Sequence, residues 1–349
     1  MRIAVVGATG NMGTALLHRI RTAQRAGHPG DLEVVGVARR LPDATAAPYD
    51  AASWRAVDVS AADAVDRLAE VFAGCDAVVH LAWVVQPSHD ETAMRRINVD
   101  GTAAMLEAAA RAGVGHVVCA SSVGAYRPGP KDRRVDESWP VDGIPASSYS
   151  RFKGEQEALL DRFAVRHPSV KVARLRPGLI FQARAGSEVR RFFVGPWLPV
   201  RGVHRLRLPL LPYPEAFIFQ AVHAEDAAEA YWRVVERGAT GAFNIAGEPV
   251  LGPGAVASLF GARRWLPLPT GLVRGAVAAA WHLRVLAADP GWVDMAAGAP
   301  LVDTTRARQE LGWSPRKSSL EALREVVAGL GEGHGVEASP LLRPEGDPA

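Results

Sequence analysis

The sequence predicts an α/β fold, in which a doubly wound parallel sheet is followed by a smaller, mostly helical C-terminal substrate lobe. Two observations lead to this prediction. Short β-branched runs alternate with longer helical patterns through the first half of the chain, and alanine-rich helical patterns fill most of 248–330. The alternation is typical of β-α-β units, in which helical crossovers join parallel strands.

Strands are expected where apolar runs are short and rich in valine. A fully buried parallel strand has such a run, because helices cover both faces of its sheet. The expected strands are Arg2–Val6, Val34–Val37, Ala77–Leu81, His116–Ala120, Val170–Phe181 and Ala242–Ile245. The expected helices between them are Gly13–Thr22, Ala93–Ala112, Ser148–Phe163 and Asp226–Glu236.

The composition disfavours several classes of protein. Hydrophobic residues make up 48% and charged residues 22% of the 349 residues, and 40 basic against 37 acidic side chains leave a net charge of +3. This balance is typical of a globular protein and predicts no nucleic-acid partner.

The apolar stretch 271–288 is interrupted by two arginines and a histidine, so it predicts a helix of the lobe, and no membrane partner is expected. Cys75 and Cys119 cannot build a disulfide framework, and a cytoplasmic location is expected.

The first expected strand runs into a glycine-rich turn at 7–13 and then into a helix. The first glycine allows a sharp turn, the second lets the backbone approach a pyrophosphate, and the third lets the helix pack closely on the strand. The helix N-terminus adds free N–H donors for the phosphates. The turn therefore predicts a Rossmann-type dinucleotide site. Its expected cofactor contacts are Gly7, Thr9, Gly10, Asn11, Met12 and Gly13.

The end of the second expected strand selects between NAD and NADP in such folds. A carboxylate at this point holds the ribose hydroxyls of NAD, whereas this chain has Arg39 and Arg40. The guanidinium of Arg39 can pair with a 2′-phosphate, so NADP is favoured over NAD as the cofactor. The alternative is that both arginines are solvated loop charges.

These expectations divide the chain into a domain, a lobe and a tail. Residues 1–181 form the dinucleotide-binding domain, to which 218–247 return. Residues 182–217 and 248–330 form the substrate lobe, and the first of these segments is a loop-rich, partly apolar lid. Residues 331–349 are rich in glycine, proline and glutamate and are expected to form a flexible tail.

Tyr149 and Lys153 are four residues apart in an expected helix and therefore share a face. A tyrosine with its ordinary pKa of ~10 is a poor base at neutral pH, but a nearby ammonium lowers that pKa. The pair predicts an acid/base centre, with a solvent-facing Tyr/Lys pair as the alternative. Ser122 favours the centre, because it follows a parallel strand at the sheet edge where ligands bind and can donate to a substrate oxygen. Asn98, a polar residue in an apolar helix, is a further candidate, with a bond to the local backbone as its alternative role.

The chain resembles the extended short-chain dehydrogenases/reductases of the NAD(P)-dependent epimerase/dehydratase family. Matching motifs occur in the same order along most of its length. They are the turn 7–13, Asp58-Val59, His80-Leu81-Ala82, Asn98 with Gly101-Thr102, Ser121-Ser122, Tyr149 with Lys153, Arg176-Pro177-Gly178, and the segments 222–228, 243–245, 303–304 and 311–315.

The resemblance implies a role for each matching residue. Tyr149 is the acid/base, Ser122 orients the reacting oxygen, Lys153 also holds the nicotinamide ribose, and Asn98 positions a water or the Lys153 helix. The cofactor contacts that it adds to those of the turn are Asp58, Val59, Leu81, Ala82, Tyr149, Lys153, Pro177 and Gly178. The resemblance also implies a homodimer built on the helices of Asn98 and Tyr149. No metal site is expected, because neither His80 nor His223 has metal-ligand spacing.

Departures from the family pattern narrow the reaction. Val123-Gly124 follow Ser122 where sugar-nucleotide dehydratases have Asp-Glu, so dehydration is disfavoured. The segment 179–182 lacks the asparagine that nucleotide-sugar epimerases often have there, which disfavours a UDP-sugar.

The expected substrate side of the site is apolar. Trp83 follows the His-Leu-Ala motif and predicts stacking against a planar or apolar substrate, with plain core packing as the alternative. Ser122 and Val123 are expected to touch the substrate as well, and Trp197 and Phe217 are candidates for further apolar lining.

The main hypothesis is a hydride transfer to or from a carbonyl or alcohol of a small, non-nucleotide metabolite, with Tyr149 as the acid/base. The first alternative is an epimerase that works through a transient keto intermediate and keeps its dinucleotide bound. The second alternative is a non-catalytic dinucleotide sensor, which is disfavoured because Tyr149, Lys153 and Ser122 are all present.

Overall fold

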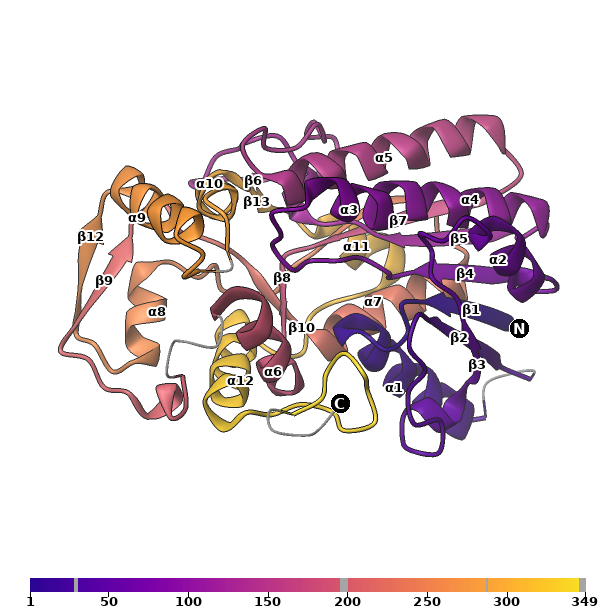
Figure 1. The fold of residues 1–349 in the computed structure, drawn as a ribbon, viewed down its shortest axis with the longest axis horizontal. Helices are drawn as coiled ribbons and strands as arrows, with labels where there is room; N and C mark the ends of the chain where they lie inside the picture. The colour runs from indigo at the N-terminus through magenta and orange to yellow at the C-terminus, as the bar shows by residue number, and fades with distance from the viewer. Residues whose placement is uncertain (28–30, 195–199, 287, 345–349) are drawn as a thin grey trace.

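Figure 1 shows the computed structural model, which describes residues 1–27, 31–194, 200–286 and 288–344. Seven parallel strands form the central sheet, in the order β11-β7-β5-β4-β1-β2-β3. These strands are β1 (Arg2–Val6), β2 (Glu33–Ala38), β3 (Ser53–Ala56), β4 (Ala77–His80), β5 (His116–Ala120), β7 (Lys171–Pro177) and β11 (Gly241–Ile245). The strand order reverses between β1 and β4, and ligands bind at such a switch point. The predicted doubly wound α/β fold is confirmed.

Helices cover both faces of the sheet (Figure 1). On one face lie α2 (Ala64–Phe72), α4 (Gly101–Arg111) and α5 (Ser148–Arg166), and on the other lie α1 (Asn11–Arg25), α7 (Ala224–Arg237) and α11 (Thr305–Leu311). Strand β1 shows why both layers form. Its Ile3 and Val5 pack with Leu17 of α1, whereas Ala4 and Val6 pack with Leu106 of α4, because successive strand residues face opposite sides.

The helix expected over 93–112 is composite. It consists of α3 (Glu91–Arg95), a π-helical turn at Arg96–Asp100 and α4. A π-helical turn inside a helix is rare and often marks a functional site. Here the turn contains Asn98, whose role is described below.

The second lobe contains more strand than the sequence predicts. In it, β9 (Leu210–Pro214) pairs with β12 (Arg264–Leu268). Beside the main sheet, β8 (Leu179–Phe181), the end of the strand expected over 170–181, pairs with β10 (Ala221–His223) of the segment that returns to the domain. The remaining helices are α6 (Gly186–Val189), α8 (Pro253–Leu259), α9 (Thr270–His282), α10 (Gly291–Gly298) and α12 (Ser319–Glu332). The lid expected over 182–217 therefore includes a regular strand, β9, which was missed because its partner lies far along the chain. Trp197 lies outside the described residues.

The expected flexible tail is wrong for its described part, residues 331–344, which pack onto both the domain and the lobe. Ser339 and Leu342 are fully buried. The Ser339 hydroxyl donates to the Thr9 carbonyl at 2.8 Å, and the Ser187 amide donates to the His334 carbonyl at 3.0 Å. The composition suggested a frayed end, but a few small and apolar side chains are enough to dock the segment.

Within the described ranges, no helix is long and apolar enough to cross a membrane. Cys75 and Cys119 are both buried and free. Two short strands, β6 (Arg134–Val135) and β13 (Leu301–Val302), pair beside the main sheet and bring the C-terminal part of the chain back to the domain.

Candidate active site

The glycine turn adopts the conformation that its sequence predicts. Gly7 has φ +84°, and a Cβ there would lie 2.6 Å from the Ala82 amide nitrogen. A Cβ at Gly13 would overlap the Gly7 carbonyl, so both glycines are required by close backbone packing. Gly10 caps α1 without a side-chain bond, and the first turn of α1 contains no acidic residue. The first N–H groups and the positive end of α1 therefore suit a pyrophosphate, and the turn fits a dinucleotide.

The other residues of the turn contact the surrounding protein. Thr9 is buried and its carbonyl accepts the Ser339 hydrogen bond. Met12 packs against the core between α1 and α7, and the Asn11 side-chain oxygen accepts a hydrogen bond from Gln182. The lobe and the tail therefore both contact this turn.

Arg39 follows β2 and Asp58 follows β3, at the carboxyl ends of these neighbouring strands. Arg39 is exposed directly after β2, and its charge helps to lower the pKa of Asp58. Burial opposes this shift of the Asp58 pKa, but hydrogen bonds from the amide and hydroxyl of Ser60 outweigh it. The positive charge expected to bind a 2′-phosphate is thus accompanied by a carboxylate. Val59 is buried and packs so tightly on Gly101 that a Cβ at Gly101 would lie 2.7 Å from it.

The loop after β4 is fastened by Asn98. The Asn98 side-chain oxygen accepts from the Val84 amide at 2.7 Å, and its nitrogen donates to the Val84 carbonyl at 3.0 Å. These bonds hold the loop that contains Trp83, next to Leu81 and Ala82. The geometry corresponds to the backbone-bonding alternative for Asn98, and makes it a positioning residue for this loop.

Ser122, Tyr149 and Lys153 come together as predicted from the end of β5 and the first turns of α5. Tyr149 is half-buried, with Ser122 close enough to act on its pKa, and the Ser122 oxygen accepts from the Gly124 amide at 3.0 Å. Lys153 is buried, and its Nζ donates to the Ala120 carbonyl at 2.8 Å and to Gln156 at 3.0 Å. The hydroxyl pair and the ammonium thus converge at the carboxyl edge of the sheet.

The Trp83 ring lies directly over the ammonium of Lys153, with 3.4 Å between Nζ and the ring centroid. A cation–π contact of this kind favours the charged lysine. Burial has the opposite effect and lowers the pKa of Lys153 to about 7, although the nearby Glu157 carboxylate partly offsets this. Among the described residues, the Trp83 indole nitrogen is buried without a hydrogen-bond partner.

The expected lowering of the Tyr149 pKa is not found. Burial raises the pKa of Tyr149, and only the Ser122 hydroxyl acts against this shift. The reason is that the Lys153 ammonium is itself buried and is directed at Ala120 and Gln156. An additional positive charge beside the phenol is therefore needed to form the phenolate at neutral pH.

Aromatic side chains surround the Tyr149 ring. Trp83 meets it edge-on at 6.0 Å between centroids, and Trp292 of α10 lies tilted at 5.2 Å. Phe193 in turn packs edge-on against Trp292 at 4.9 Å. Sequence reasoning missed Trp292 and Phe193, because only the folded lobe brings them to α5. Stacking of Trp83 on the substrate stays a prediction.

Two other expected lining residues lie in different surroundings. Val123 packs against a small cluster with Tyr126 and Val302. The Phe217 ring packs against Tyr213 of β9, at 6.2 Å between centroids. Neither contact involves Tyr149, so their roles at the substrate stay predictions.

A buried charge network, which sequence reasoning missed, holds α5 against the sheet. Glu157 is fully buried and accepts from Arg176 at 2.8 and 2.9 Å, from Arg174 at 3.0 Å and from Ser121 at 2.6 Å. Burial alone would raise the pKa of Glu157, but the bonds and charges of Arg176 and Arg174 lower it to about 2. Because Ser121 precedes Ser122 and Glu157 lies one turn beyond Lys153, the network fixes the catalytic groups relative to each other.

Pro177 and Gly178 lie at the carboxyl end of β7, the neighbour of β5 in the sheet. A Cβ at Gly178 would lie 2.5 Å from the Gln220 carbonyl, so this position also needs glycine. This places both residues at the edge that contains Ser122, which is compatible with their expected contact with the nicotinamide.

His80 is a core residue. Burial lowers its pKa to about 3, and its Nε2 lies 3.1 Å from the Thr102 hydroxyl. His223 lies 3.0 Å from Glu325 and 3.2 Å from Lys317. Among the described residues, no group of three or more His, Cys, Asp or Glu side chains could hold a metal ion.

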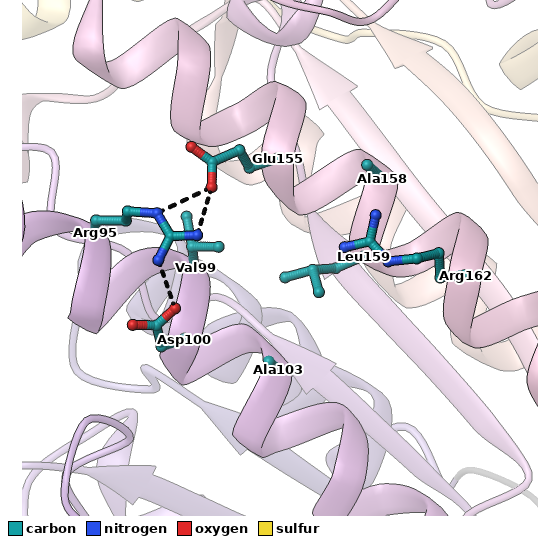
Figure 2. Close-up of a pocket in the computed structure, with 8 residues that line it drawn as sticks. All are labelled: Arg95, Val99, Asp100, Ala103, Glu155, Ala158, Leu159 and Arg162. Atoms are coloured by element: carbon teal, nitrogen blue, oxygen red, sulfur yellow. Dashed lines mark hydrogen bonds and ion pairs between the residues drawn. The ribbon is translucent and has the colours of Figure 1, made fainter.

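A pocket of about 170 Å³ lies away from this centre, between the helices of Asn98 and Tyr149 (Figure 2). In it, Arg95 bridges Glu155 at 2.8 Å and Asp100 at 2.9 Å. Ser122, Tyr149 and Lys153 do not line this pocket. It is a feature of the helices on which a homodimer is expected. The homodimer stays a prediction.

Comparison with known proteins identifies the family. The NAD dependent epimerase/dehydratase family matches residues 3–246, which include the glycine turn, Ser122, Tyr149 and Lys153. The chain belongs to this family. The match includes all the ordered motifs of the sequence from the glycine turn to 243–245, so the predicted resemblance is confirmed, and the motifs at 303–304 and 311–315 lie beyond it.

One relative of the chain is a dehydrogenase. The NAD-dependent glucose-6-phosphate dehydrogenase of Haloferax volcanii is 30% identical over 203 residues, which cover 54% of this chain and 72% of that protein. An uncharacterized protein of Mycobacterium tuberculosis, Rv2047c, is 28% identical over 332 residues, or 94% of this chain. The chain spans only 30% of the length of that mycobacterial relative.

Solved structures share the fold. The dTDP-glucose 4,6-dehydratase DesIV of Streptomyces venezuelae, with NAD and TYD bound, has a TM-score of 0.69 and 21% identity, covering 95% of this chain and 97% of that one. The UDP-glucose 4-epimerase of Thermus thermophilus, in complex with NAD, has a TM-score of 0.66 and 20% identity, covering 95% and 99%. At these identities the likeness supports the fold alone.

Proposed function

We propose that this family member is an NAD-dependent epimerase that oxidises a hydroxyl-bearing carbon of a sugar-like substrate, nucleotide sugars included, to a transient ketone and reduces it again from the other face. The observation that carries the proposal is the convergence of Ser122, Tyr149 and Lys153 at the sheet edge beside the glycine turn. A UDP-glucose 4-epimerase is among the proteins that share this fold, so the fold is compatible with the reaction. This proposal departs from the net hydride transfer and the non-nucleotide substrate favoured by the sequence.

The chain's own residues would handle the proton of the substrate hydroxyl. In the proposal, this hydroxyl binds between Ser122 and Tyr149, and the Tyr149 oxygen takes its proton as the carbonyl forms. Ser122 donates to the same substrate oxygen, and Lys153 supplies positive charge behind the tyrosine. A bound oxidised nicotinamide would accept the hydride and would add the positive charge that Tyr149 lacks in this structure.

We propose NAD rather than NADP as the cofactor. The preference for NADP rested on Arg39, but the carboxylate of Asp58 lies close enough for Arg39 to lower its pKa, so the region is not purely positive. The named dehydrogenase relative is NAD-dependent, and both structural neighbours described above contain NAD. Comparison of the affinities for NADH and NADPH tests this, and a tighter complex with NADPH would restore the first preference.

Tyr149→Phe tests the acid/base assignment. Loss of the proton-transfer group should reduce turnover by about 10²–10⁴-fold, while the dinucleotide stays bound. The assay incubates the enzyme with UDP- and dTDP-sugars and follows new epimers by NMR, and released dinucleotide is quantified after denaturation. Tyr213→Phe in the lobe is the matched control and should keep full activity. Undiminished turnover by Tyr149→Phe would contradict the assignment.

Net dehydrogenation is the second candidate, because the named relative at 30% identity is a dehydrogenase. The two reactions use the same residues but differ in the fate of the hydride. A substrate deuterated at the reacting carbon keeps its label through epimerisation and loses it to free cofactor in net oxidation. Accumulation of reduced nicotinamide with each turnover would favour the dehydrogenase.

A further inference from the structure

The part of the lobe farthest from the main sheet has an unusual surface. We call residues 200–217 and 250–286 the outer lobe; it contains β9, β12, α8 and α9 and projects to one end of the molecule (Figure 1). Of nine large hydrophobic side chains that the described residues expose, six lie in the outer lobe. They are Leu206, Leu210, Leu266, Leu272, Leu283 and Val285, with exposed fractions between 40% and 75%.

The β9–β12 ribbon has one face without a partner. Leu210 pairs with Arg264 and Pro212 pairs with Leu266, so these four side chains share a face, and all four are exposed. The opposite face contains the half-buried Tyr213, and burial raises the Tyr213 pKa to about 12. Parallel strands are ordinarily covered on both faces. An apolar face on a two-stranded parallel ribbon therefore indicates a surface that is covered in use.

Helix α9 continues this surface. None of its 13 residues is buried, although most are apolar. Leu272 in its first turn is 65% exposed, and Leu283 directly after it is 75% exposed. One face of the helix is partly covered, with Trp281 stacked on His89, but Leu272 and the residues just after the helix remain in water.

The charge of the outer lobe indicates what covers it. The two segments contain seven arginines and one acidic residue, Glu215, whereas the whole chain has a net charge of only +3. Among the described residues, only Arg274 of these seven arginines forms a side-chain ion pair, and its partner is Asp294 at 2.9 Å. Two copies of so basic a surface repel each other, and a nucleic acid would leave the leucines in water. A surface that combines exposed leucines with unpaired arginines is complementary to an anionic lipid bilayer.

We propose that the outer lobe docks peripherally on an anionic membrane surface, inserting the leucines of the ribbon and of α9 among the lipids while its arginines contact the phosphates. Such docking needs no membrane-crossing helix. It would hold the outer lobe at the bilayer and leave the sheet domain in water.

Vesicle flotation of the full chain tests the proposal. We expect binding to vesicles that contain phosphatidylglycerol, at least tenfold weaker binding to pure phosphatidylcholine, and loss of binding at high salt. The variants Leu272→Ser/Leu283→Ser and Arg263→Gln/Arg264→Gln should each weaken binding about tenfold or more. Because these side chains are exposed, circular dichroism and dinucleotide affinity should not change.

Val165→Ser/Arg166→Gln is the matched control, since it removes an exposed apolar side chain and an exposed arginine from α5 and should bind vesicles normally. No flotation, equal flotation with neutral vesicles, or normal flotation of both lobe variants would overturn the proposal. If the protein does not bind vesicles, a dimer that depends on the outer lobe would also overturn the proposal, and so would tight binding of an oligonucleotide.

Discussion

The sheet domain and the outer lobe use the same side chains in opposite ways. Leu16 and Leu17 of α1 are 1% and 0% exposed, whereas Leu272 and Leu283 at α9 are 65% and 75% exposed. In the domain, leucines between strands and helices stabilise the fold by leaving water. In the outer lobe they contribute little to the fold, so their presence points to a contact outside the chain. The acid/base centre belongs to the domain, and the Tyr149 ring there is covered by Trp292 of α10, a helix outside the outer lobe.

Glu157→Gln should have the largest effect, because it tests whether buried contacts in the sheet domain stabilise the fold. The substitution leaves Arg176 buried without its carboxylate and leaves Arg174 with Asp161 alone, and loss of one partner of a buried ion pair costs about 3–5 kcal/mol. We expect a drop of this size in the free energy of unfolding, measured by urea denaturation. Turnover at low temperature should also fall, because Ser121, next to Ser122, loses the charged acceptor of its hydrogen bond.

Glu155→Gln is the matched control two residues away on α5. Glu155 is exposed and pairs with Arg95 at 2.8 Å (Figure 2). A surface ion pair contributes about 0–1 kcal/mol, so this variant should be nearly as stable as the wild type. Equal losses in the two variants would show that burial of the charge network is not what holds α5.

A leucine-to-alanine pair compares the two regions directly. Leu160→Ala in the domain core should lower the free energy of unfolding by about 2–5 kcal/mol, because it opens a cavity where the side chain is 0% exposed. Leu283→Ala in the outer lobe should change it by less than about 0.5 kcal/mol. If the two losses were similar, the outer lobe would have its own core contacts and the contrast between the regions would fail.

The loss of stability at acid pH should also arise in the sheet domain, from Glu157. The folded-state pKa of Glu157 is lowered from 4.5 to about 2, so its contribution is fully present above the unfolded pKa and is lost as the pH falls from about 4.5 towards 2. Denaturation midpoints measured across this range should decline in the wild type. The decline should be shallower in Glu157→Gln, which has no carboxylate to protonate there, and parallel curves would contradict the assignment.

Local patterns predicted the parts of the site that depend on neighbouring residues. The glycine turn follows β1 in the chain, and the spacing of Tyr149 and Lys153 places them on one helix face, so both could be predicted. The β9–β12 pair and the contact of Trp292 with Tyr149 could not, since each joins segments far apart in the chain.

The charge network left a signal that could have been used. Arg174 and Arg176 alternate within an otherwise apolar strand and so face the same side, where burial requires a partner. Glu157 was missed because a glutamate on a helix ordinarily faces water. The tail was misjudged for a similar reason, since its composition is polar but Leu342 and Ser339 are buried.

The tail provides the smallest expected effect, at the contact between domain and lobe. Ser339→Ala removes the donor to the buried Thr9 carbonyl in the glycine turn, which should cost about 1 kcal/mol of stability. Because that carbonyl belongs to the turn expected to hold the pyrophosphate, NADH affinity should fall by a similar free energy, measured by fluorescence titration. Ser258→Ala in α8, whose hydroxyl bonds only within its own helix, is the control and should change neither quantity. If stability falls as expected but NADH affinity does not change, the tail stabilises the fold without affecting the glycine turn.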